Sequence, residues 1–180
     1  MKKHILWNFI SFLLIWYSCG SQKDSTLIAD QAIKEYLTTL NGVFINTPSN
    51  QQFLATIDQK IVYYKDYNAL PLRDTLNTTL KYIFSEKNGR IFKDQLKKNV
   101  VWSEKPYVKQ SIIRREAKNN YKDKTVYVLS HPVVTHDGNY VLLRVSFFNQ
   151  RYMTGLDELL VFKKQKGRWI IYKRFELSLF

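Results

Sequence analysis

Cysteine is almost absent from this chain of 180 residues, which contains only Cys19. A single thiol cannot form an intramolecular disulfide, and zinc or redox motifs that need paired cysteines are excluded. Histidine is also scarce, and the spacing of His131 and His136 matches no metal-binding pattern. The sequence lacks a nucleophile-elbow serine motif, a phosphate-binding loop and a dinucleotide fingerprint. It therefore carries no enzyme signature, and no catalytic residue, metal or cofactor is expected.

The longest apolar run lies near the start of the chain, over residues 5–17. Lys2 and Lys3 precede this run, and the small residue Ser18 follows it. A positive start, a short apolar run and a small residue are typical of a secretory signal peptide. The run is shorter than the ~20 residues that a permanent transmembrane helix needs. We therefore expect residues 1–18 to be a signal peptide that is removed during export.

The lone cysteine directly follows this segment, in the sequence Trp16-Tyr17-Ser18-Cys19. A lone thiol in an exported protein needs an explanation other than a disulfide, and a thioether to lipid is such an explanation. Residues 1 to about 25 resemble the signal segment and lipobox of bacterial lipoproteins, including those of Bacteroidetes. The resemblance implies that Cys19 receives diacylglycerol, carries palmitate-type acyl chains and becomes the new N-terminus. It further implies an exported protein that is anchored to the bacterial envelope, with the outer membrane as the expected location.

The remaining chain has the size of one domain with a substantial core. We expect residues 19–25 to be a polar tether and residues 26–180 to form a single domain. Apolar residues recur at helical spacing over three segments, residues 25–40, 48–64 and 75–88. Asn88-Gly89 is predicted to end the third helix, and a fourth, shorter helix is predicted over residues 91–99.

After about residue 124 the apolar period changes from that of a helix to that of a strand. Asp137-Gly138 predicts a two-residue turn of type I′ that joins strands near 126–135 and 140–148. Lys166-Gly167 is expected to join two further strands, which gives an antiparallel meander of about four strands. Helices followed by strands predict an α+β fold, with three to four N-terminal helices packed on one side of the C-terminal meander.

The segments "YVLSHPVVTHDGNYVLL" and "LVFKKQKGRWII" carry a second resemblance. Together with "FKDQLKKNVVW", they are similar to a recurrent pattern in small exported Bacteroidetes proteins of an uncharacterised family. The similarity covers roughly residues 91–172. It lies in turns and core residues, so it implies a fold and no active site.

Positive charge exceeds negative charge by 13 in the whole chain, and by 11 once residues 1–18 are removed. Residues 81–124 contain thirteen Lys or Arg and five Asp or Glu. Such a surface attracts anionic lipid, acidic glycan or an acidic envelope protein. An exported protein is not expected to meet nucleic acid. The candidate contacts with an anionic surface are Lys97, Lys98, Arg114 and Arg115. A solvated basic face without a specific partner is the alternative interpretation.

Two functions are compatible with these features. The first is a lipid-anchored interaction module of the cell envelope. The second is a pocket-bearing α+β domain, similar to the nuclear-transport-factor or cystatin folds, that binds or acts on a small ligand. A cavity lined by polar groups between helices and sheet would favour the second. The acidic pair Asp157-Glu158 is interpreted here as the solvated start of a strand.

Overall fold

The protein is described by a computed structural model that covers residues 25–40, 43–46, 51–66, 75–97, 112–114, 125–149, 152 and 154–179. The predicted signal peptide, Cys19 and most of the predicted tether lie outside the described residues, as do Lys98 and Arg115.

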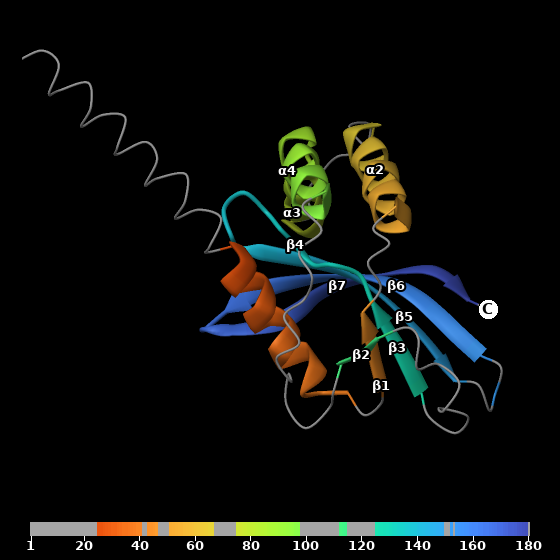
Figure 1. Ribbon diagram of the computed structural model, residues 1–180. Helices are drawn as coiled ribbons and strands as arrows, with labels where there is room; N and C mark the ends of the chain where they lie inside the picture. Colours follow the sequence, from red (N-terminus) through yellow and green to blue (C-terminus); the bar gives the residue numbers. More distant parts are fainter. Residues whose placement is uncertain are drawn as a thin grey trace, which may run out of the picture.

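A single mixed sheet forms the centre of the molecule (Figure 1). Its strands are β1 (Val43–Asn46), β2 (Ile112–Arg114), β3 (Thr125–Leu129), β4 (Val133–Val134), β5 (Tyr140–Asn149), β6 (Thr154–Gln165) and β7 (Arg168–Leu179). The strand order is β2-β1-β3-β5-β6-β7, and β4 pairs with β5 beside this path. The strands β3 to β7 pair antiparallel, whereas β1 lies parallel to both β2 and β3. The predicted antiparallel meander is therefore confirmed and is extended at one edge by two short parallel strands.

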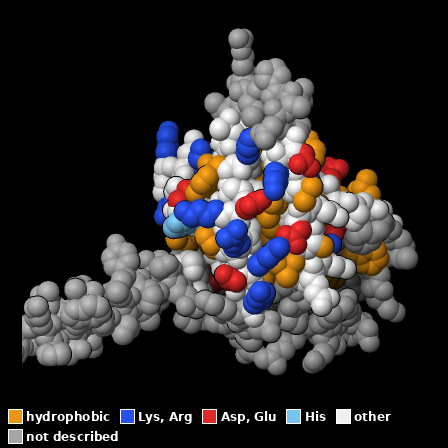
Figure 2. Space-filling model, turned by 90° about the horizontal axis from the view of Figure 1, so that it is seen from above, with side chains coloured by type: hydrophobic (Ala, Val, Ile, Leu, Met, Phe, Trp, Pro, Cys, Tyr) orange, Lys and Arg blue, Asp and Glu red, His pale blue; other side chains and the backbone are white. Residues whose placement is uncertain are grey.

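The described helices belong to the first part of the chain. They are the N-terminal helix over residues 25–37, α2 (Gln51–Asp66), α3 (Thr75–Ile83) and α4 (Glu86–Lys97). Helices followed by an antiparallel sheet confirm the α+β class. Seen from the side of α2, α3 and α4, side chains of both charge signs are intermixed with apolar ones (Figure 2).

The expectation that all helices pack on one side of the sheet is wrong. The N-terminal helix covers one face, and α2, α3 and α4 cover the other. The buried residues of β5 explain why, because Val141 and Leu143 point to the first face while Leu142 points to the second. A strand that is buried on both faces has a continuous run of apolar residues in its sequence, and not an alternation of apolar and polar residues. The runs "YVLL" and "LLVF" of β5 and β6 are such runs.

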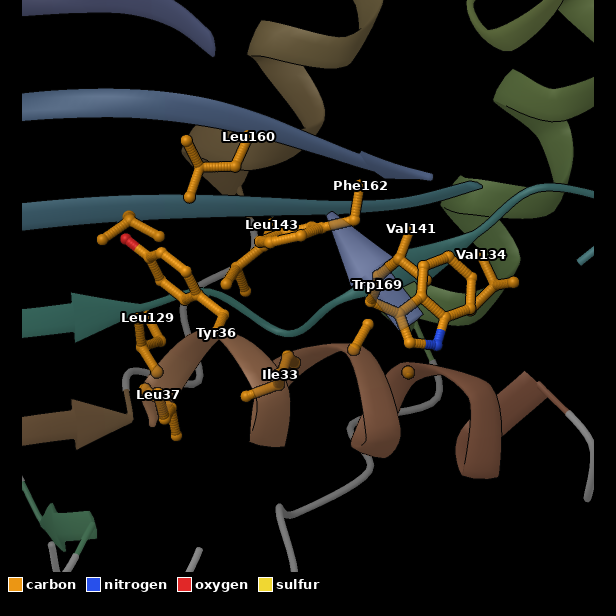
Figure 3. Close-up of a cluster of buried hydrophobic side chains, with 13 residues drawn as sticks. Ile33, Tyr36, Leu37, Leu129, Val134, Val141, Leu143, Leu160, Phe162 and Trp169 are labelled. Carbon is orange, nitrogen blue, oxygen red and sulfur yellow. The ribbon is translucent and has the colours of Figure 1, made fainter. Parts of the chain in front are cut away.

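Two apolar clusters hold the layers together. In the first cluster, Ile33, Tyr36 and Leu37 of the N-terminal helix pack against sheet residues that include Phe162 and Trp169 (Figure 3). The rings of Tyr36 and Phe162 meet edge to face, with their centroids 5.4 Å apart. The second cluster, on the opposite face, joins α2, α3 and α4 to the sheet through side chains that include Phe53, Phe84, Phe92, Leu142 and Val161. Edge-to-face pairs stabilise a core beyond the burial of their area.

Asn88-Gly89 does not end a helix, which corrects the prediction. The pair lies within α4, and the helical break falls at Phe84-Ser85. Ser85 caps α4, because its Oγ accepts a hydrogen bond from the backbone N–H of Asn88 at 3.4 Å. A Cβ atom on Gly89 would lie 2.4 Å from Cδ1 of Ile61, so a larger residue there would displace the Ile61 side chain between α4 and α2. The glycine therefore serves packing between helices and not termination.

The Asp137-Gly138 turn also differs in type from the prediction. Five residues, 135–139, connect β4 to β5, and the backbone N–H of Thr135 donates a hydrogen bond to the backbone oxygen of Tyr140 across this loop. Gly138 has a positive φ of 70°, whereas Asp137 does not. The two-residue type I′ turn occurs instead at Lys166-Gly167, where both φ values are positive, 49° and 81°. The predicted connection between β6 and β7 is thus confirmed.

Replacing Gly138 with valine is expected to destabilise the protein by about 1–3 kcal/mol. A β-branched residue resists positive φ, and its Cβ would also lie 3.1 Å from Cδ1 of Ile28. Urea unfolding measures the effect. Gly138→Asn is the matched control and should cost less, because asparagine tolerates this backbone region. A Gly138→Val protein that unfolds at the same urea concentration as the wild type would contradict the turn assignment.

Candidate functional site

Three segments meet at one end of the molecule, where the N-terminal helix begins (Figure 1). Ile28, near the start of that helix, lies against Gly138 in the β4–β5 loop. The next residue of this loop, Asn139, accepts a hydrogen bond on its backbone oxygen from the backbone N–H of Lys164 at 3.4 Å. Lys164 belongs to the hairpin between β6 and β7. The β6–β7 hairpin is therefore located beside the point where the described chain begins.

This hairpin ends in a group of cations, here called the cationic tip and formed by Lys163, Lys164, Lys166 and Arg168. Residues 159–175 contain no Asp or Glu. The side chains of Lys164, Lys166 and Arg168 are exposed. The ammonium of Lys164 lies 5.9 Å from the ring of Trp169, within the range of a cation–π contact. The tip is thus a local excess of positive charge on a well-packed hairpin.

The hairpin is fixed to the N-terminal helix by a polar contact. The backbone N–H of Trp169 donates a hydrogen bond to a side-chain oxygen of Glu35 at 2.5 Å. The indole ring of Trp169 is buried in the cluster that includes Ile33 and Val134 (Figure 3). Hydrogen bonds to a charged group are among the stronger ones in proteins. The cationic tip therefore keeps a defined position relative to the helix.

The cations predicted from the sequence are placed differently. Lys97 is exposed at the end of α4, and the backbone of Arg114 ends β2 and pairs with that of Asn46. On the helical face that includes α4, cations and carboxylates are intermixed (Figure 2). Some are paired, as in the exposed contact of Lys93 with Asp58 at 2.8 Å. A mixed face gives a weaker field than a group of cations without carboxylates.

Asp157 and Glu158 are not the solvated start of a strand, which corrects that interpretation. Both residues are 5% exposed. Arg144 binds the Asp157 carboxylate with its Nε and Nη2 atoms, and the hydroxyl of Ser146 donates to the same carboxylate at 3.0 Å. Glu158 accepts a hydrogen bond from Nη1 of Arg174 at 3.2 Å. Successive residues of a strand point to opposite faces, so the two carboxylates occupy separate sites.

Glu158 and Arg174 are close enough to the phenol of Tyr36 to affect its pKa. Burial raises the pKa of the Tyr36 phenol well above its usual range. The charge of Arg174 opposes this increase, while the charge of Glu158 adds to it. The buried carboxylate of Glu158 is thus paired with the guanidinium of Arg174, whose side chain is 51% exposed. A buried charge with a partner of opposite sign costs less free energy than an unpaired one.

His131 is a half-buried histidine near the N-terminal helix. Burial lowers its pKa, and the nearby carboxylate of Asp30 opposes this decrease. Its pKa in the unfolded chain, ~6.5, is therefore higher than in the folded protein.

Stability should consequently decrease as the pH falls below about 6.5, because the unfolded chain then binds the proton more strongly. One such group changes the free energy of unfolding by at most about 1.4 kcal/mol per pH unit. Urea unfolding of wild type and His131→Gln between pH 7.5 and 5 measures this contribution as the difference between the two proteins. The same slope in wild type and His131→Gln would contradict the assignment.

Within the described residues, no group of three or more His, Cys, Asp or Glu is arranged to hold a metal ion. None of the helices in the described ranges is long and apolar enough to cross a membrane.

Comparisons of this chain with protein-family models, with curated proteins and with solved structures found no match. The geometry of the chain is therefore the basis for a functional interpretation.

The cationic tip was missed by reasoning from the sequence, although a signal was present. "FKKQKG", followed by Arg168, places four cations within seven residues without a carboxylate. The candidate cations were instead predicted within residues 81–124, because the excess of positive charge is larger there. Only the contacts of the folded chain place the tip next to the N-terminal helix.

Proposed function

We propose that this protein is a lipid-anchored interaction module of the bacterial cell envelope. In this proposal residues 1–18 are removed and Cys19 carries the lipid, as its resemblance to the lipoprotein class implies. The cationic tip of the domain then faces an anionic partner in the envelope.

One observation carries the proposal. The N-terminal helix is already in place at residue 25, and its apolar side packs into the core through Ala29, Ala32 and Ile33. Six Cα steps separate residue 25 from Cys19. Because an extended chain spans about 3.4 Å per residue, the helix begins within about 20 Å of the lipid attachment point in any conformation. Such a short connection supports a role at the membrane surface.

The alternative, a domain that binds a small ligand, would require a cavity lined by polar groups between helices and sheet. Where the chain is described, apolar side chains of the two clusters pack at both interfaces. The buried carboxylate of Asp157 is held by Arg144 and Ser146. These observations favour the interaction module.

Washing of isolated envelopes tests the proposal. A protein held by acyl chains stays with the membrane in high salt and in alkaline carbonate, because each buried CH₂ contributes ~0.8 kcal/mol. A protein held by charge alone is released by high salt, which screens charges beyond about 3 Å at 1 M. Retention of the wild-type protein through both washes is expected. Release by either wash would contradict the proposed lipid anchor.

A further inference from the structure

We infer that the cationic tip is a second membrane contact, which binds the anionic phospholipid headgroups of the bilayer that holds the Cys19 lipid. This inference rests on the proposed function. It assigns to Lys164, Lys166 and Arg168 a role in orienting the domain at the membrane.

The position of the tip is the first reason. The lipid attachment point is within about 20 Å of residue 25. From there, Ile28 contacts Gly138, and Asn139 is hydrogen-bonded to the backbone of Lys164. The tip and the anchored end of the domain therefore lie on the same side of the molecule, as Figure 1 shows.

Charge is the second reason. The tip carries four cations, which outnumber the carboxylates of Asp137 and Glu35 in the adjoining loop and helix. Asp137 accepts hydrogen bonds from the hydroxyl of Thr135 at 2.6 Å and from the side chain of Asn139 at 2.7 Å. Glu35 accepts the hydrogen bond from the backbone of Trp169. A surface with this imbalance is complementary to phospholipid phosphates.

The shape of the hairpin is the third reason. The type I′ turn at Lys166-Gly167 projects the cations from an antiparallel ladder that is continuous from Phe162 to Gln165, so little ordering is needed on binding. Lys163 pairs across the strands with Ile170, whose side chain is 41% exposed. Cations beside an exposed apolar side chain fit the interface between headgroups and acyl chains.

Anchoring makes even a weak contact effective. A lipid at Cys19 keeps the tip at a high local concentration near the headgroups. Each Lys or Arg near an anionic surface strengthens attachment by about five-fold. Three exposed cations are therefore expected to favour the contact by on the order of 100-fold at low salt.

The test uses the mature lipidated protein in vesicles and a label on the β6–β7 hairpin. With Cys19 lipidated, a cysteine introduced by Gln165→Cys is the single free thiol and accepts a nitroxide or fluorescent label. Thr154→Cys is the matched control, because it labels the opposite end of the same strand, β6. Both positions are exposed. Access of a water-soluble quencher to each label is measured on neutral vesicles and on vesicles with phosphatidylglycerol.

Protection of the label at position 165 is expected on the anionic vesicles only, and 1 M salt should reverse it. The label at position 154 should stay accessible throughout. Equal access to the label at position 165 on both kinds of vesicle would overturn the inference. Protection by an acidic polysaccharide in place of anionic vesicles would also overturn it. Flotation with neutral vesicles reports the lipid anchor separately, so failure of the anchor and failure of the tip are distinguishable.

Variants identify the residues responsible. The combination Lys164→Gln, Lys166→Asn and Arg168→Gln should abolish the protection, and an asparagine directly before Gly167 retains a turn sequence of high propensity. A charge-retaining combination, Lys164→Arg, Lys166→Arg and Arg168→Lys, should keep the protection and so controls for folding. Replacement of Lys97, Lys98, Arg114 and Arg115 by Gln should leave it unchanged. The assignment of the membrane contact to the tip would be wrong if the label lost its protection in the Lys97, Lys98, Arg114 and Arg115 variant but kept it in the Lys164→Gln, Lys166→Asn and Arg168→Gln variant.

Discussion

Arg144→Met is expected to lower the free energy of unfolding by about 3–5 kcal/mol. Arg144 binds the Asp157 carboxylate through two nitrogen atoms, and both side chains are largely buried, with 16% and 7% of their areas exposed. Removing the guanidinium leaves a buried negative charge whose remaining side-chain donor, among the described residues, is the hydroxyl of Ser146. An uncompensated buried charge is among the largest costs that a single substitution produces. Urea unfolding of the purified protein measures the change.

A double variant provides the matched control for this prediction. Arg144→Met combined with Asp157→Asn removes both charges and keeps an acceptor for the Ser146 hydroxyl. We expect the double variant to be more stable than Arg144→Met alone, because no unpaired charge remains buried. If the double variant lost at least as much stability as the two single variants together, the proposed coupling between the residues would be wrong.

Cys19→Ala is expected to remove nearly all of the protein from the membrane fraction or to leave it as the unprocessed precursor. Several acyl chains bind a bilayer stably, whereas a single myristoyl chain gives only marginal binding. The contribution of the cationic tip alone is weak at physiological salt, where charges are screened over about 8 Å. Fractionation of cells that express each protein measures the change.

Ser18→Ala is the matched control for this variant, because it keeps a small residue before the cysteine. It should be processed and retained like the wild type. Equal shares of wild type and Cys19→Ala in the salt-washed membrane fraction, with residues 1–18 removed from both proteins, would contradict a role of Cys19 in anchoring.

Much of the fold could be predicted from local patterns. Helical spacing located the N-terminal helix and α2, since Ala29, Ile33 and Phe53 recur on faces that are buried in the structure. The change to a period of two located β5, and Lys166-Gly167 identified the hairpin of β6 and β7. These signals are local because they arise from the geometry of single elements.

Features that depend on tertiary contacts were not predicted. Asn88-Gly89 has the composition of a helix stop, yet Gly89 lies against Ile61 of α2 and Asn88 is hydrogen-bonded to the backbone of His136. The strands β1 and β2 contain four and three residues, too few to show a period of two. The side of the sheet on which a helix packs depends on the chain connection and not on the apolar stripe of the helix.

The candidate site was predicted only in part. The excess of positive charge and the hairpin were both visible in the sequence. The cationic tip lies close to the N-terminal helix because residues far apart in the chain contact each other, such as Trp169 with Glu35. The pairing of Asp157 with Arg144 likewise depends on the register of β5 with β6. Neither the register of two strands nor the proximity of distant segments can be predicted from the amino-acid composition.

Intact-mass analysis of the wild-type protein, purified from the envelope of a lipoprotein-processing bacterial host, tests the central proposal most directly. We predict a chain that begins at Cys19 and is heavier than residues 19–180 by a diacylglyceryl group and any further acyl chain. An unmodified thiol at Cys19, or a chain that still contains residues 1–18, would contradict the proposed lipid anchor.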